Sequence, residues 1–200
     1  MLKIIFVTSS PRRIELLGKF NIKVDIVKPK FEPQVSFKDP CKTATMKAKG
    51  KIQSTLPKIP QDSIVIAADT VVYAEGRIIG KPRNERDAIK MLKRLSGKTH
   101  YVITALVFAS SDKVVTKCVK TMVSFKKLSM KEIIWYIKTK EPMDKAGAYA
   151  IQGYGALFVK RIKGDYYNVL GLPLNTIYTV LKNEFNVNLL EAINIQKRNV

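Results

Sequence analysis

The sequence predicts one α/β domain that spans residues 1–200. Apolar segments of strand length alternate with segments of helical periodicity, and residues 63–68 form an unbroken apolar run, as expected for a strand buried on both faces. No repeat, low-complexity tract or long linker interrupts this alternation. With 46% hydrophobic residues, the chain can bury a sizeable core in one continuous fold, with two lobes around a cleft.

The first half of the chain is predicted to begin with a strand and then a helix. Ser10 would be the N-cap of this helix and Pro11 its first residue. Strands are expected at residues 2–7, 22–27, 63–68, 71–73 and 78–79, and a lysine-rich helical segment at residues 43–52. We expect Asp69 to end the buried strand abruptly and Glu75-Gly76 to turn a hairpin.

The second half is predicted to combine helices with longer strands. Asn84 would cap a helix with apolar residues at i, i+3, i+4 and i+7. Ser129 and Glu132 form a capping box before another helix, in which we expect Trp135 to join the core. A last helix is expected at residues 173–181. Strands are expected at residues 101–109, 113–125, 157–162 and 166–170.

Cysteine and histidine usage limits the chemistry. Cys41 and Cys118 are the only cysteines and lie far apart in sequence, so we expect neither a disulfide framework nor a thiolate zinc site. His100 is the only histidine, which excludes a multi-histidine metal site, and we interpret it as a structural hydrogen-bonding residue. A reducing compartment fits best. The apolar run that ends at Val7 is too short for a signal peptide, so we expect a cytoplasmic protein without a membrane partner.

The chain is strongly basic, with 36 Lys and Arg residues against 16 acids and a formal charge of +20. Such a field attracts anions, and nucleic acid is one candidate partner. However, the lysines are scattered and no recognised nucleic-acid motif occurs, so we regard nucleic acid as unlikely. A basic surface that steers a polyanionic small substrate is equally consistent with this charge.

The turn Ser9-Ser10-Pro11-Arg12-Arg13 joins the first strand to the first helix. Hydroxyls and two guanidiniums at the end of a strand form a suitable phosphate site. The alternative is an ordinary helix start, in which Ser10 and Pro11 serve only as cap and first residue. Capping does not explain two arginines where the helix dipole disfavours cations.

Asp69 is the carboxylate that the sequence marks most clearly, because it follows a buried strand. At the rim of an α/β sheet it would orient a water molecule or hold a divalent metal, unless it merely caps or turns the chain. Glu32, beside Phe31 in a loop, is a weaker candidate for the same site. Lys47 and Lys81 could supply cations, although either lysine could equally be solvated surface.

Residues 141–155 form a second dense segment. Small residues surround Tyr149, and glycines follow at 153 and 155, which predicts a tightly folded loop where backbone approaches a ligand closely. Gln152 both donates and accepts hydrogen bonds, which suits reading the edge of a nucleobase. A hydrogen bond that closes the loop explains Gln152 equally well.

Together these segments resemble the Maf family of nucleoside triphosphate pyrophosphatases, within the superfamily that also contains the inosine triphosphate pyrophosphatases. The matching segments are residues 9–17, 68–72, 80–82, 91–100, 141–155 and 167–174. The resemblance implies an inosine triphosphate pyrophosphatase-like fold, in which a long twisted mixed β-sheet flanked by helices forms two lobes around a central cleft. It also implies a homodimer.

The resemblance further implies hydrolysis of a nucleoside triphosphate between the α and β phosphates, with a divalent cation, Mg²⁺ or Mn²⁺. Asp69 would accept a proton from water, and Glu32 would join it in metal coordination. Lys81 would complete the catalytic set. Ser10, Arg13, Lys47 and Lys81 would hold and neutralise the phosphates, and Ser9 would also bind the substrate. Arg12, Thr70 and Gln152 would govern base selection.

The segments 144–149 and 151–153 are similar to the branch that prefers dTTP and UTP. The leading hypothesis is therefore a pyrimidine triphosphate pyrophosphatase that keeps unwanted nucleotides out of nucleic acids. Alternatives are the same chemistry on purine or methylated guanosine triphosphates, or a non-catalytic nucleotide or nucleic-acid binder that restrains cell division. Two departures from the family pattern bear on metal binding and on the conformation of the second loop. Phe31 stands where a further acid is common, and Ala150 replaces a glycine.

Overall fold

A long mixed sheet forms the centre of the protein. The computed structural model describes residues 3–193. The strands are β1 (Lys3–Val7), β2 (Asp25–Val27), β3 (Ser63–Ala74), β4 (Arg77–Ile79), β5 (Thr99–Ala109), β6 (Val114–Phe125) and β7 (Val159–Lys163). Their order is β2-β1-β3-β5-β6-β7, with β4 paired to β3. β1 runs parallel to β2 and β3, and the other pairs are antiparallel. The expected mixed sheet is confirmed.

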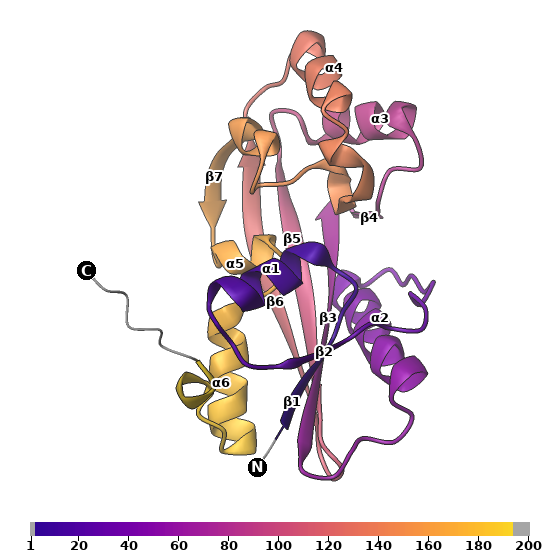
Figure 1. The fold of residues 1–200 in the computed structure, drawn as a ribbon. Helices are drawn as coiled ribbons and strands as arrows, with labels where there is room; N and C mark the ends of the chain where they lie inside the picture. Colours follow the sequence, from indigo (N-terminus) through magenta and orange to yellow (C-terminus); the bar gives the residue numbers. More distant parts are fainter. Residues whose placement is uncertain (1–2, 194–200) are drawn as a thin grey trace, which may run out of the picture.

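Helices cover both faces of this sheet. They are α1 (Pro11–Lys19), α2 (Pro40–Thr55), α3 (Glu85–Leu95), α4 (Met130–Lys138), α5 (Tyr166–Val169) and α6 (Leu174–Phe185), with 3₁₀ turns η1 (Glu141–Asp144), η2 (Ala146–Ala148), η3 (Tyr154–Phe158) and η4 (Leu189–Ala192). Figure 1 shows a lower part with α1, α2 and α6 and an upper part with α3 and α4, through both of which the long strands run. This arrangement matches the two expected lobes.

The two faces of β3 belong to different hydrophobic clusters, because successive side chains of a strand point in opposite directions. Ile64, Ile66 and Ala68 pack in the main core with residues of α1, α3, α4 and α6. Val65 and Ala67 pack with residues of α2 on the other face. By this alternation Asp69 faces α2 and Thr70 faces the side of α1.

One edge of β3 changes its partner halfway along. β1 pairs with β3 only as far as Ala67, and β4 pairs with it only from Val72 onward. Within residues 3–193, no strand pairs with residues 68–71 along this edge, although β5 pairs with them on the other side. The edge of the sheet is therefore open beside Asp69 and Thr70.

Several local predictions are confirmed at the level of single hydrogen bonds. The Asn84 side chain caps α3 by accepting from Asp87 N at 2.9 Å. Ser129 and Glu132 form the expected capping box of α4. Glu75 and Gly76 both have positive φ, as a tight hairpin turn between β3 and β4 requires. The long hairpin of β5 and β6 is also present.

Two strand predictions are wrong. Asp69 does not end its strand: β3 continues to Ala74, and Asp69 pairs with Ala105 of β5. Residues 166–169 form the short helix α5 rather than a strand, because Asp165 caps it by accepting from Tyr167 N at 2.7 Å and Asn168 N at 3.2 Å. The predicted strand at residues 22–27 is reduced to Asp25–Val27.

Trp135 is not a core residue, contrary to expectation. It is 46% exposed, whereas Ile133, Tyr136 and Ile137 of the same helix are buried. Five consecutive apolar residues cannot all face inward from a helix, because each residue turns the helix by about 100°. Trp135 lies on the outer side, edge-to-face with Tyr154 at a centroid distance of 5.4 Å.

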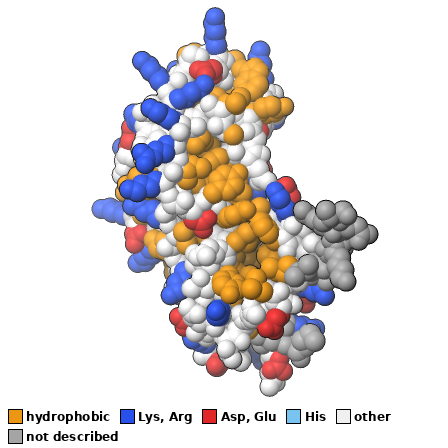
Figure 2. All heavy atoms as spheres, turned by 90° about the vertical axis from the view of Figure 1, so that its left-hand side faces the viewer, with side chains coloured by type: hydrophobic (Ala, Val, Ile, Leu, Met, Phe, Trp, Pro, Cys, Tyr) orange, Lys and Arg blue, Asp and Glu red, His pale blue; other side chains and the backbone are white. Residues whose placement is uncertain are grey.

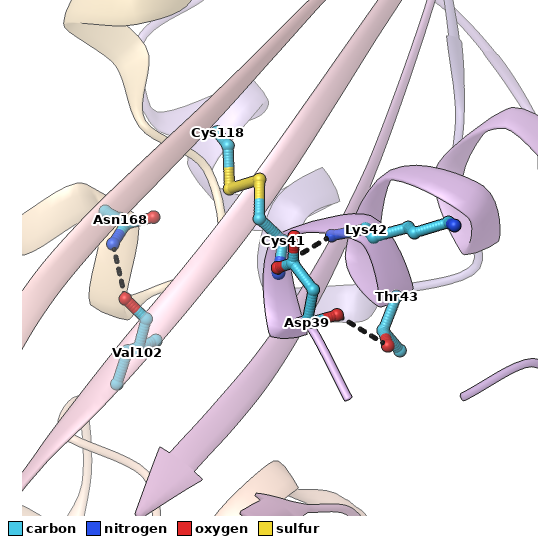
Figure 3. Close-up of a disulfide and its surroundings, with 7 residues drawn as sticks. All are labelled: Asp39, Cys41, Lys42, Thr43, Val102, Cys118 and Asn168. Carbon is cyan, nitrogen blue, oxygen red and sulfur yellow. Dashed lines mark hydrogen bonds between the residues drawn. A yellow bond between two sulfur atoms is a disulfide. The ribbon is translucent and has the colours of Figure 1, made fainter. Parts of the chain in front are cut away.

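Cys41 and Cys118 form a disulfide, so the expectation that the two cysteines provide no disulfide framework is wrong. Figure 3 shows the bond joining the start of α2 to β6. Asp39 caps α2 by accepting from Cys41 N at 2.7 Å, and the two cysteine Cα atoms lie 6.1 Å apart. A separation of 77 residues in sequence says nothing about this distance, because α2 packs across β5 toward β6 only in the folded sheet.

The surface displays the excess of positive charge. Figure 2 shows Lys and Arg side chains from top to bottom of one face, beside a central band of hydrophobic side chains. Among the described residues, no helix combines the length and the hydropathy that crossing a membrane requires.

Candidate active site

A cleft of about 540 Å³ opens where the edge of β3 lacks a strand, a volume typical of small-molecule sites. Its charged and polar lining consists of Ser9, Ser10, Arg12, Arg13, Glu32, Gln34, Lys47, Lys51, Asp69, Thr70, Lys81, Asp144 and Lys145. Its apolar lining includes Val71, Val72, Ile78, Val102, Tyr149, Ile151, Val169 and Leu170. The cleft thus combines cations and carboxylates with a substantial apolar wall.

Lys51 is the central cation of the cleft. Its Nζ lies 2.8 Å from Asp69 Oδ1 and 2.9 Å from Glu32 Oε2, and donates to the carbonyl of Ala68 at 3.3 Å. Lys51 is only 4% exposed and Asp69 only 9%. The ammonium group therefore joins a strand carboxylate to a loop carboxylate inside the cleft.

Glu32 reaches this cluster from the loop between β2 and α2. Ser9 Oγ donates to Glu32 Oε1 at 3.0 Å. Burial raises the pKa of Glu32, but the hydrogen bonds from Lys51 and Ser9 and the positive charges of Lys51 and Lys81 outweigh burial and lower it. Glu32 is therefore held in its charged form.

Arg13 is buried and ties three segments together. Its Nε donates to Gly171 O at 2.7 Å, its Nη1 to Ala68 O at 3.0 Å and its Nη2 to Thr70 Oγ1 at 2.9 Å. A guanidinium has five N–H donors, so these three bonds leave two N–H groups for a ligand. Burial lowers the pKa of Arg13, and the charges of Asp69 and Glu32 counteract this.

The remaining cations approach from separate elements. Arg12 is half-buried at the start of α1, Lys47 lies one helical turn before Lys51 on α2, and Lys81 is exposed just after β4. Ser10 is the N-cap of α1 by position, but its side chain makes no capping bond. Ser10 lines the cleft, so capping alone does not account for this residue.

The apolar wall lies farther along β3. Val72 pairs directly with Val102 of β5 at the position three residues beyond Asp69, and Tyr149 lines the cleft from the segment after η2. His100 Nε2 shares a hydrogen bond with Tyr149 Oη at 2.8 Å. Burial lowers the pKa of His100 to about 4, so this histidine is neutral at pH 7 and acts structurally.

The model of the family described as "Maf-like protein" matches residues 3–184. This chain belongs to the Maf family. A dTTP/UTP pyrophosphatase of Thermosipho melanesiensis is 47% identical over 89% of this chain and 96% of its own length. A dTTP/UTP pyrophosphatase of Pyrococcus furiosus is 47% identical over 91% and 95%, and one of Aquifex aeolicus is 44% identical over 90% and 95%.

A solved structure extends the likeness to more distant proteins. The HAM1 protein from Coxiella burnetii superposes with a TM-score of 0.52 at 13% identity, covering 91% of this Maf-family chain and 99% of its own. At this identity only the fold is comparable, and it agrees with the expected fold class.

Nine of the ten sequence-predicted site residues of this Maf-family protein line the cleft: Ser9, Ser10, Arg12, Arg13, Glu32, Lys47, Asp69, Thr70 and Lys81. Gln152 is exposed and lies outside the lining, so its role in base selection stays a prediction. Ile151, the residue before Gln152, does line the cleft.

Sequence reasoning missed Lys51. The signal was present, because Ala44, Ala48 and Ile52 mark the buried face of α2, and Lys51 falls on that face. A lysine at a buried helical position needs a partner, and the isolated acid Asp69 was already known. Combining the two observations predicts the ion pair.

Asp69 and Glu32 fit a divalent cation that also binds the phosphates of a substrate. Among the described residues no three His, Cys, Asp or Glu side chains gather, so the protein alone does not supply a complete metal site. Mg²⁺, however, is commonly held by one or two carboxylates together with substrate phosphates. Two carboxylates that converge on one cationic position match that donor set.

Proposed function

We propose that this protein hydrolyses dTTP and UTP to the nucleoside monophosphate and pyrophosphate. The observation that carries the proposal is the placement of Asp69, Lys51 and Glu32 in a cation-lined cleft beside an apolar wall. A site for a nucleoside triphosphate needs cations to bind the phosphates and an apolar wall to contact the base and sugar. The names of the relatives, dTTP/UTP pyrophosphatases, support the choice of pyrimidine nucleotides.

In this proposal Asp69 acts as the general base. It orients a water molecule and takes its proton while the water oxygen bonds to the α-phosphorus. The bond from that phosphorus to the α–β bridging oxygen breaks, and this oxygen leaves as part of pyrophosphate. Lys51 holds the Asp69 carboxylate in place through the 2.8 Å contact between Lys51 Nζ and Asp69 Oδ1. The side chains that hold the phosphates and neutralise their charge are Ser9, Ser10, Arg13, Lys47 and Lys81. Arg12 and Thr70 influence the choice of base.

Asp69 and Glu32 would hold Mg²⁺ or Mn²⁺ together with the substrate phosphates. The metal would supply further neutralisation of the phosphate charge. Ser9 Oγ and Lys51 Nζ orient the Glu32 carboxylate for this role, since each bonds to one of its oxygens.

We also propose that the chain acts as a single domain over residues 1–200, in a cytoplasmic homodimer. Removal of unwanted pyrimidine triphosphates from the nucleotide pool would be its cellular task. The alternative substrates are purine and methylated guanosine triphosphates, and the alternative class is a non-catalytic regulator of cell division.

The decisive measurement is pyrophosphate release from UTP and dTTP with Mg²⁺ or Mn²⁺. We expect Asp69→Asn to lower kcat by about 10²–10⁴-fold, because the amide cannot take the proton. Asp112→Asn, in the exposed turn between β5 and β6, is the matched control and should leave kcat unchanged.

Other outcomes distinguish the alternatives. Equal rates for the native protein and Asp69→Asn would overturn the mechanism. A higher kcat/KM for a purine or methylated guanosine triphosphate would overturn the pyrimidine assignment. No turnover of any triphosphate would favour the non-catalytic binder.

A further inference from the structure

The segment after α4 forms one wall of the cleft without a regular helix or strand to hold it. It runs through η1, η2 and η3 and contributes Tyr149 and Ile151 to the cleft lining. Such a wall needs a specific support, because it lacks a ladder of backbone hydrogen bonds.

Glu141 supplies that support from outside the cleft. Its Oε1 accepts from Tyr136 Oη at 2.7 Å and from Gly155 N at 3.1 Å, and its Oε2 accepts from Tyr154 N at 2.9 Å. Among the described residues, no Lys or Arg nitrogen lies within 4.0 Å of this carboxylate. The hydrogen bonds to this carboxylate therefore come from an O–H donor of α4 and two N–H donors of the segment.

Tyr136 connects Glu141 to the cleft wall by hydrogen bonds. Its ring is fully buried, and its Oη accepts from Ala150 N at 3.0 Å while donating to Glu141. Ala150 stands between Tyr149 and Ile151, two of the residues by which this segment lines the cleft. A hydrogen-bonded path thus runs from Glu141 to the backbone of the cleft wall.

The glycines of this segment are explained by the same contact. A Cβ on Gly153 would overlap the Glu141 carboxylate, and a Cβ on Gly155 would lie 2.5 Å from Ala150 O and 2.8 Å from Tyr136 Oη. At Gly153 and Gly155 the backbone approaches Glu141 and Tyr136 closely. The tight fold expected from the sequence is therefore present.

We propose that Glu141 is a positioning residue that shapes the nucleoside end of the cleft through Tyr136. The inference rests on the proposed function and deepens it. Tyr149, Ile151 and Val72 form an apolar wall, with Asp144 and Lys145 of the same segment also lining the cleft, whereas Lys51 and Glu32 gather around Asp69. Loss of the Glu141 contacts should therefore weaken recognition of the base and sugar more than recognition of the phosphates.

The test compares UTP with inorganic tripolyphosphate, which carries the phosphates without a nucleoside. Calorimetry in EDTA, which removes the divalent cation that hydrolysis requires, measures the binding of both without turnover. For Glu141→Gln we expect the Kd of UTP to rise by about tenfold, because the Gln amide nitrogen cannot accept a hydrogen bond from the backbone. The Kd of tripolyphosphate should stay unchanged.

A second variant and a matched control separate positioning from general stability. Tyr136→Phe keeps the ring and removes Oη, so it should raise the Kd of UTP in the same way, and the double variant should add little to either. Glu132→Gln removes the capping-box glutamate of α4, so it should lower the melting temperature but leave both Kd values unchanged.

Trp135 gives a readout that needs no ligand. It is the only tryptophan and packs against Tyr154, whose backbone N–H bonds to Glu141. In Glu141→Gln its emission should shift to longer wavelength, because loss of the Tyr154 contact exposes the indole to water.

Equal weakening of UTP and tripolyphosphate, or unchanged binding of both, would overturn the inference. An unchanged Trp135 spectrum in Glu141→Gln would also contradict it. If the native protein binds UTP but does not hydrolyse it, the proposed function is wrong, while the binding comparison still decides the role of Glu141.

Discussion

Lys51 determines the charge balance of the cleft at the scale of single residues. Its ammonium group is the partner of Asp69 in the described structure and also bonds to Glu32. Removing one member of a buried ion pair leaves a charge without compensation, and this costs far more than the pair contributes when intact. In the proposed mechanism, stability and catalysis therefore depend on the same side chain.

We expect Lys51→Met to lower the free energy of unfolding by about 3 kcal/mol, because Asp69 would lose its buried partner. Urea unfolding monitored by circular dichroism measures this. Lys49→Met, on the same helix but outside the cleft lining, should change stability little. Equal unfolding midpoints for the two variants would show that the ion pair has no net effect.

The same substitution offers a check on the cation site. Mg²⁺ between Asp69 and Glu32 would replace part of the lost positive charge. The destabilisation by Lys51→Met should therefore be smaller in the presence of Mg²⁺ than in EDTA.

Among the elements, α2 has the largest influence on the site. It carries Lys47 and Lys51, and its small residues Ala44 and Ala48, which are fully buried, let it approach the sheet closely. Thr43 Oγ1 accepts from Phe37 N at 2.8 Å and so ties the helix to the loop that carries Glu32. The disulfide adds a covalent tie at the same end.

Reduction of Cys41–Cys118 should destabilise the protein by about 2–4 kcal/mol, because the bond closes a long loop that the unfolded chain would otherwise leave open. Melting temperatures with and without dithiothreitol measure this. Cys118→Ser should be less stable than the native protein and insensitive to dithiothreitol. Two free thiols in the untreated native protein would contradict the disulfide.

At the scale of the whole molecule, the net charge of +20 surrounds a cleft that is itself rich in cations. Exposed charges of one sign raise the encounter rate with a polyanion, and salt screens them within about 10 Å at 0.1 M. The positive surface and the cleft therefore act in the same direction on a triphosphate.

Accordingly, kcat/KM for UTP should fall on the order of tenfold when NaCl rises from about 0.05 M to about 0.5 M at constant free Mg²⁺. The loss should appear mainly in KM, because screening weakens attraction before binding rather than the chemical step. Steady-state kinetics over a salt series measures this. A salt-independent kcat/KM would show that the surface charge does not steer the substrate.

Local signals in the sequence were sufficient for most elements and for much of the site. Caps such as Asn84 and Ser129 and the periodicity of strands and helices depend on neighbouring residues, so they can be predicted without the fold. The hydroxyls and guanidiniums of the turn from Ser9 to Arg13 are also close in sequence, so their clustering can be predicted without the fold. Trp135 shows the limit, because periodicity alone did not say which face of α4 would be buried.

The sequence by itself determined the order of the elements, the family pattern and the presence of Asp69 among cations. Only the tertiary structure decided that β3 continues past Asp69 beside an open edge, that Lys51 lies between Asp69 and Glu32, that Cys41 meets Cys118, and that Gln152 stays outside the cleft lining. The physical reason is the distance along the chain over which each kind of interaction acts. Caps and periodicities act within a few residues, whereas these contacts join segments that only the packing of α2 and the loops on the sheet brings together.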